Sequence, residues 1–127
     1  MARILVIDDE EDSRALVRQA LESDGHEVIP AMDGAEGLAL QRERAADLVI
    51  TDIFMPEADG IETIHEIKKD FPRVKVIAMS GGGRGSSMLQ SVLTTASALG
   101  IDAFLRKPFD FSTLLQSVRQ VMGQSAA

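Results

Sequence analysis

The chain contains no cysteine, which excludes disulfide bonds and metal sites built on thiolates. It also lacks any apolar run that approaches the roughly 20 residues needed to span a membrane as a helix. Near the start only Ile4–Ile7 are consecutively apolar, which is too short for the apolar core of a signal peptide. We therefore expect a soluble, cytoplasmic protein that does not enter a membrane.

Basic residues are also scarce, with 13 Lys and Arg against 20 Asp and Glu and a formal net charge of −7. Such an acidic chain is a poor candidate for direct binding to nucleic acid or to an anionic membrane surface. Residues 1–79 hold 18 acidic and 9 basic residues, whereas residues 80–127 hold 2 and 4. Five of the acids form a single run at residues 8–12, which in most proteins would be a solvated face.

The length of 127 residues and the hydrophobic share of 45% predict one globular domain with a real core. We place this domain at residues 1–123 and expect a short C-terminal tail at residues 124–127. Apolar runs of strand length occur at residues 4–7, 48–50, 74–79 and 103–105, with a weaker candidate at 26–29. Helical spacing of apolar residues occurs around residues 16–21, 35–39, 61–71, 89–96 and 114–122.

Strand and helix therefore alternate five times along the chain. This alternation, with apolar runs covered on both sides, predicts an α/β fold with a parallel sheet. In such a sheet, ligands bind beyond the carboxyl ends of the strands. The residues expected at that edge are Asp8 and Asp9, Asp52, Ser80, and Lys107 followed by Pro108.

These residue types suggest a particular chemistry. Three carboxylates at one edge repel one another unless a cation compensates them. Hard oxygen ligands suit Mg²⁺, and a hydroxyl and an ammonium beside the metal would complete a site for a tetrahedral anion. We infer phosphoryl transfer, with an Asp carboxylate as the nucleophile.

The motifs that carry this chemistry also resemble a known family. The segments Ile4–Glu10, Asp52–Gly60, Ala78–Ser80 and Lys107–Phe109 follow the order found in the receiver domain of bacterial two-component response regulators. The resemblance covers about residues 2–122 and implies a stand-alone receiver with a doubly wound, flavodoxin-like fold. Its five parallel strands would have the order 2-1-3-4-5, with five helices distributed over both faces.

The resemblance implies a role for each matching acid. Asp52 would be the phosphoacceptor and form an aspartyl phosphate. Asp9, Asp52 and the backbone carbonyl of Phe54 would bind Mg²⁺ directly, while Asp8 would act through a coordinated water.

It also implies roles for residues of the later strands. Lys107 would contact the phosphoryl oxygens, and the Lys107–Pro108 peptide bond would be cis. Ser80 would bond the phosphoryl group and swing inward on activation, and Phe104 would be an aromatic switch that follows Ser80.

The implied partners are proteins. A histidine kinase or a phosphotransfer protein would supply the phosphoryl group. A downstream target would bind the face formed by the helix at 89–96, the strand at 103–105 and the helix at 114–122. In 127 residues we expect no separate output domain, and we expect a monomer or weak dimer. The chain would catalyse only its own phosphorylation and dephosphorylation, and is otherwise not an enzyme.

Three alternatives remain. A Mg²⁺-dependent phosphohydrolase with an Asp nucleophile would need a second Asp two residues later, where Phe54 stands. A flavodoxin-like cofactor module would need a phosphate-binding loop after the first strand, where the acidic run would repel phosphate. A receiver that is never phosphorylated would serve only as a docking module.

Two departures from the family pattern stand out. The connection Gly81–Ser87 makes the segment between Ser80 and Lys107 longer than in compact receivers, and it lacks the Lys-Ser/Thr of a nucleotide-binding loop. Phe54 is bulky at a position where smaller or polar residues are common. We hypothesise that it blocks the water that would hydrolyse the acyl phosphate. The histidines, His26 and His65, lack ligand spacing and are expected at the surface.

Overall fold

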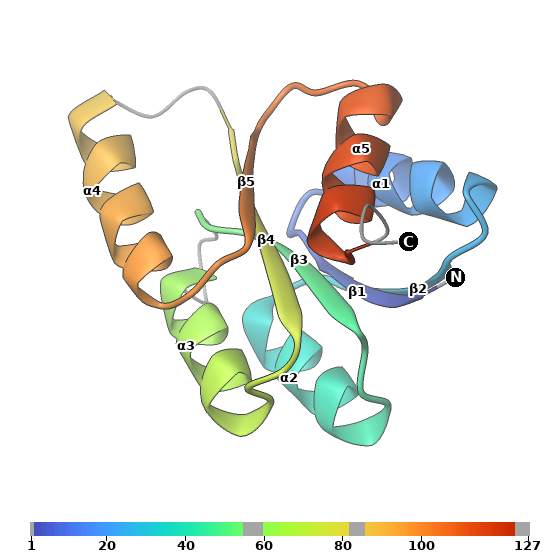
Figure 1. Cartoon of the computed structure of the whole chain (residues 1–127), viewed down its shortest axis with the longest axis horizontal. Coiled ribbons are helices and arrows are strands. Elements are labelled where there is room, and N and C mark those ends of the chain that lie inside the picture. The colour runs from blue at the N-terminus through green and yellow to red at the C-terminus, as the bar shows by residue number, and fades with distance from the viewer. Residues whose placement is uncertain (1, 55–59, 82–85, 124–127) are drawn as a thin grey trace.

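The computed structural model describes residues 2–54, 60–81 and 86–123. Residues 55–59 of the Asp52–Gly60 motif and residues 82–85 of the glycine-rich connection lie outside these ranges. The described elements alternate strand and helix as predicted, and Figure 1 shows their arrangement.

All five strands are parallel and lie in the order β2-β1-β3-β4-β5, which confirms the predicted topology. The strands are β1 (Arg3–Ile7), β2 (Glu27–Ala31), β3 (Leu48–Asp52), β4 (Lys75–Ser80) and β5 (Ala103–Arg106). The helices are α1 (Glu11–Ser23), α2 (Gly34–Glu43), α3 (Gly60–Asp70), α4 (Ser86–Ala98) and α5 (Phe111–Val121).

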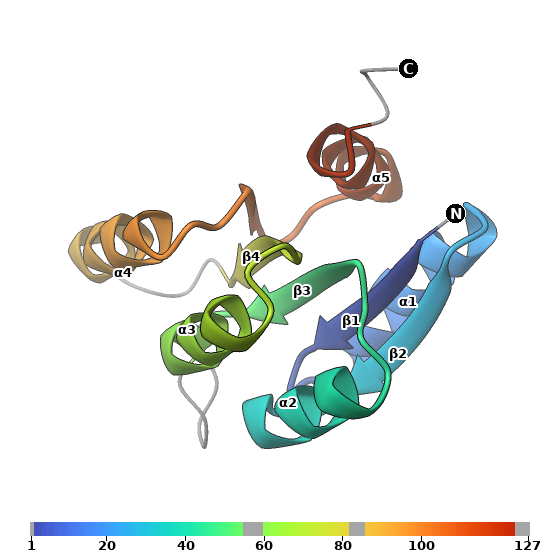
Figure 2. The ribbon, with the colours of Figure 1, turned by 60° about the horizontal axis from the view of Figure 1, so that its bottom comes forward.

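The helices cover the two faces of the sheet unequally. Helices α1 and α5 lie together on one face, and α2, α3 and α4 lie on the other (Figures 1 and 2). Because strand side chains alternate between faces, Ile4 and Val6 enter the core beneath α1 and α5. Leu5 and Ile7 enter the core beneath α2, α3 and α4. Both faces are therefore buried, which explains the uninterrupted apolar runs.

Local signals set several helix ends. The Asp110 carboxylate accepts the backbone N–H of Thr113 at 2.8 Å and so caps α5, and Asp33 caps α2 in the same way through Glu36 at 2.8 Å. Both contacts satisfy amide groups that a helix start leaves unpaired. Gly25, just past α1, has a φ of 88°, a left-handed conformation that glycine adopts without strain.

The weak strand candidate at residues 26–29 is the real strand β2, which extends to Ala31. Pro30 lies within it, and the strand tolerates this proline because β2 is at the edge of the sheet. Each predicted element therefore has a counterpart, with shifted bounds where the apolar pattern is weakest. Among the described ranges, no helix combines the length and the apolar character that a membrane crossing requires.

The expectation that both histidines lie at the surface was wrong for His26. Its side chain is only 11% exposed, and its Nε2 lies 3.6 Å from a carboxylate oxygen of Asp24. Its Nδ1 accepts the backbone N–H of Ala2 at 3.1 Å, because the pairing of β1 with β2 draws position 26 beneath the start of the chain. The side chain of His65 is 59% exposed, as expected.

Candidate functional site

Strand register places the first two acids of the site side by side. In the pairing of β1 with β3, Ile7 lies opposite Thr51, so Asp8, just past the end of β1, lies level with Asp52, the last residue of β3. The alternation of side chains along a strand directs both toward the face covered by α1 and α5. The two residues are 44 positions apart in the sequence, yet the sheet makes them neighbours.

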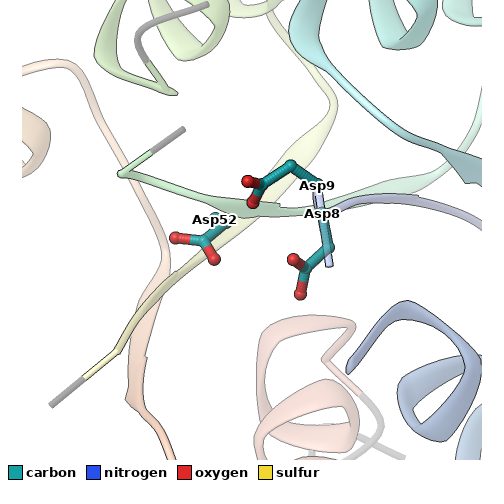
Figure 3. A group of neighbouring side chains, drawn as sticks. All are labelled: Asp8, Asp9 and Asp52. Atoms are coloured by element: carbon teal, nitrogen blue, oxygen red, sulfur yellow. The ribbon is translucent and has the colours of Figure 1, made fainter. Parts of the chain in front are cut away.

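Asp9 completes a cluster of three acids (Figure 3). One carboxylate oxygen from each of Asp8, Asp9 and Asp52 lies within 4.8 Å of the others. Asp8 is fully buried and Asp52 is 5% exposed, whereas Asp9 is exposed at the mouth of the cluster. This set of close, hard oxygen donors could hold a metal ion.

Lys107 reaches the same cluster from β5. Ser80 pairs with Arg106 at the end of the β4–β5 ladder, and the backbone N–H of Lys107 donates to the carbonyl of Ser80 at 2.8 Å. The side-chain Nζ donates to Asp8 at 2.8 Å and to Asp52 at 2.9 Å, and a carboxylate oxygen of Glu10 lies 3.8 Å away. The peptide bond from Lys107 to Pro108 is cis.

Burial and charge act together on these groups. Burial raises the pKa of Asp52, and the negative charge of Asp8 adds to this effect, while Lys107 opposes both. Burial alone would lower the pKa of Lys107, but its hydrogen bonds to Asp8 and Asp52 and their charges raise it above its ordinary value. The ammonium therefore stays charged, and one cation is shared between two buried carboxylates. A further cation at the cluster would offset the remaining negative charge.

Ser80 and Phe104 lie at the same edge of the sheet as the acids. Their strand positions face α2, α3 and α4, whereas Asp8 and Asp52 face α1 and α5. Ser80 follows Met79, which belongs to the core under α1 and α5, so alternation directs Ser80 toward α3 and α4. It is fully buried, and its hydroxyl donates to the carbonyl of Gly81 at 3.2 Å. Phe104 is half-buried against the core on that second face.

Backbone contacts position the chain after the phosphoacceptor candidate. The N–H of Phe54 donates to Asp52 Oδ1 at 3.1 Å, and Phe54 packs, half-buried, against the core beneath α2, α3 and α4. The N–H of Gly60 returns to the carbonyl of Ile53 at 3.0 Å. A Cβ at Gly60 would lie 2.4 Å from the carbonyl oxygen of Asp52, so only glycine allows this approach.

The sequence analysis missed two residues that contact the backbone of the acid cluster, Gly60 and Arg14. Gly60 ends the recognised motif, yet nothing in the linear pattern indicated its contact with the Asp52 backbone. Arg14 donates from Nη1 to the backbone carbonyl of Asp8 at 2.8 Å. The only available signal was its place two residues after the acidic run, which brings it to the same end of the sheet.

Comparison with known proteins shows the family to which this chain belongs. Residues 4–119 match the response regulator receiver domain family. The chemotaxis protein CheY of Bacillus subtilis is 33% identical over 94% of this chain and 97% of its own length. The crystal structure of the receiver domain of NtrX from Brucella abortus matches with a TM-score of 0.85 and 35% identity, over 94% of this chain and 97% of that one.

The chain belongs to the response regulator receiver domain family of two-component systems. Some relatives are much longer. The transcriptional regulatory protein GlrR of Escherichia coli K12 is 36% identical over 98% of this chain, which spans only 27% of GlrR. Receiver domains are signalling modules rather than classical enzymes, so the family match favours neither the phosphohydrolase nor the flavodoxin-like cofactor module.

Proposed function

We propose that this chain receives a phosphoryl group on Asp52 from a histidine kinase or a phosphotransfer protein, in a reaction that requires Mg²⁺. The observation that carries the proposal is the position of the Asp52 carboxylate, which lies in the three-acid cluster and 2.9 Å from Lys107. Asp9, Asp52 and the carbonyl of Phe54 would hold the ion, with Asp8 acting through water. Bound there, Mg²⁺ would supply charge neutralisation for the phosphoryl oxygens.

The residues of the chain supply the remaining chemistry. An oxygen of Asp52 attacks the phosphorus of phosphohistidine, so that a P–O bond forms while the P–N bond breaks. The electron pair of that bond leaves with the imidazole, which then takes up a proton. Lys107 already contacts the acceptor carboxylate, and it can transfer its hydrogen bonds to the incoming phosphoryl oxygens.

The signal would leave through a protein contact. The added group carries about −1.5 to −2 charges, which would draw the Ser80 hydroxyl and Lys107 toward it. Phe104, on the same side of the sheet as Ser80, would follow. The face formed by α4, β5 and α5 would then bind a downstream target protein, in the cytoplasm, with the receiver as a monomer or weak dimer and without direct contact to nucleic acid.

Labelling by a small phosphoryl donor tests the acceptor. We expect acetyl phosphate or phosphoramidate to add one phosphoryl group in the presence of Mg²⁺, as measured by intact mass. Asp52→Ala should abolish the addition, whereas Asp12→Ala, at an exposed acid of the same run, should not. Labelling that survives Asp52→Ala would exclude Asp52 as the acceptor. A folded wild-type protein that takes no label would instead indicate an unphosphorylated docking module.

Thermal unfolding tests the ion. Mg²⁺ should raise the melting temperature of the wild-type protein, because a ligand that binds only the folded state stabilises it. Asp9→Asn should remove this increase while changing the metal-free melting temperature little, since Asp9 is exposed. Asp12→Asn should retain the increase. An equal response in all three proteins would place the ion elsewhere.

A further inference from the structure

The guanidinium of Arg14 holds the backbone on which two of the acids stand. Arg14 is half-buried in the first turn of α1, and its Nη1 donates to the carbonyl oxygen of Asp8 at 2.8 Å. The backbone N–H of Arg14 donates to the carbonyl of Glu10 at 2.9 Å. This helical hydrogen bond fixes the position of the Arg14 backbone, from which the side chain extends. The long side chain therefore reaches back across the turn between β1 and α1.

Every other polar group of Asp8 is also held. Its N–H donates to the carbonyl of Ala31 at 3.1 Å, its Oδ1 accepts the N–H of Glu10 at 3.0 Å, and its Oδ2 accepts from Lys107 at 2.8 Å. Strand β1 ends at Ile7, so the carbonyl of Asp8 lies past the last residue of the strand. Asp8 is fully buried with Arg14 in place, so truncation of the Arg14 side chain would take away the donor that satisfies this carbonyl.

The carbonyl of Asp8 belongs to the same planar peptide unit as the N–H of Asp9. A hydrogen bond that fixes this oxygen therefore also fixes the direction in which the chain presents Asp9. Asp9 is the exposed member of the acid cluster, so its orientation depends on the backbone more than on packing.

We propose that Arg14 is a positioning residue, which orients the Asp8–Asp9 peptide so that both carboxylates can share a divalent cation. The inference rests on the proposed function, since it concerns the Mg²⁺ site assigned there. Arg14 donates to a backbone carbonyl and not to a carboxylate, so its role would be separate from that of the ligands. It acts as a partner of the ligands, and loss of such partners commonly weakens metal binding by about 10–100-fold.

The test measures the dissociation constant for Mg²⁺ by titration calorimetry in three variants. Arg14→Met should weaken binding about 10-fold or more, and Arg14→Lys, which keeps a cationic donor, should recover part of the affinity. Arg18→Met is the matched control, because Arg18 lies one turn further along α1 and pairs with Glu22 at 3.0 Å. Its affinity should stay within about twofold of wild type.

Urea unfolding without Mg²⁺ separates positioning from general stability. Arg14→Met that loses stability but binds Mg²⁺ with wild-type affinity would overturn the proposal, and so would equal weakening in Arg14→Met and Arg18→Met. If Arg14→Met does not fold, Arg14→Gln takes its place with a smaller expected loss of affinity, because its neutral amide is a shorter and weaker donor than the guanidinium, and wild-type affinity in that variant would overturn the proposal. A wild-type protein that binds no Mg²⁺ would instead refute the proposed function.

Discussion

The carboxylate of Asp52 lies 2.9 Å from the ammonium of Lys107, although 55 residues separate them in the sequence. Both groups are largely covered, with side-chain exposures of 7% and 15%. The same ammonium also bonds to Asp8, so a single cation offsets two buried negative charges. This imbalance favours the binding of a second cation at the acid cluster, which could hold a metal ion.

Removal of the ammonium should destabilise the metal-free protein. Lys107→Met leaves the buried carboxylate of Asp8 and that of Asp52 without their shared donor, so we expect a loss of about 2 kcal/mol in the free energy of unfolding at neutral pH. Urea unfolding in a chelator measures this loss. Lys69→Met, at an exposed position of α3, should change stability by less than about 0.5 kcal/mol. A Lys107→Met protein as stable as wild type would show that the ion pair only balances its own desolvation.

The raised pKa of Asp52 makes a prediction about pH. The pKa of Asp52 is higher in the folded protein than the ordinary value of 3.8. Its contribution to stability is therefore complete below pH 3.8, and it is lost as the pH rises through the pKa of the folded state. Without Mg²⁺, Asp52→Asn should therefore be more stable than wild type near neutral pH. The difference in melting temperature between Asp52→Asn and wild type should shrink as the pH falls toward 4. A difference that widens instead would contradict the raised pKa of Asp52.

The close approach of Gly60 predicts a position that admits only glycine. In Gly60→Ala the new methyl would lie 2.4 Å from the Asp52 carbonyl oxygen and 2.5 Å from the Cα of Ile53. We expect a loss of about 2 kcal/mol in urea unfolding, together with weaker labelling of Asp52. Gly81→Ala is the control for stability, because a Cβ there meets no described atom within 4 Å. Equal losses in the two variants would refute the packing argument.

The side chain of Phe54 should protect the phosphorylated form. Its backbone N–H bonds to Asp52, which keeps residue 54 beside the acceptor. Phe54→Asn should therefore accelerate loss of the phosphoryl group several-fold, since a smaller polar side chain admits and orients the attacking water. Phe54→Leu retains the apolar bulk and should decay at nearly the wild-type rate. Unchanged or slower decay in Phe54→Asn would refute the shielding hypothesis.

Much of the architecture could be predicted from local patterns. Apolar runs such as Ile4–Ile7 indicate strands covered on both faces, and the alternation with amphipathic segments implies a parallel sheet. The acids at strand ends then follow from chain position alone. The weakest run, at residues 26–29, gave inaccurate bounds, because β2 is an edge strand that contains Pro30 and continues past it to Ala31.

The sequence by itself determined the order of the elements and which side chains reach the carboxyl edge of the sheet. Only the tertiary structure decided which of those side chains meet. The register between β1 and β3 sets Asp8 beside Asp52, and the end of β5 brings Lys107 between them. Alternation directs Ser80 to the opposite face, and Arg14 finds the Asp8 carbonyl. These contacts depend on the register between strands and on backbone N–H and C=O groups. Every residue type except proline carries the same backbone groups, so the local sequence does not show which of them will pair.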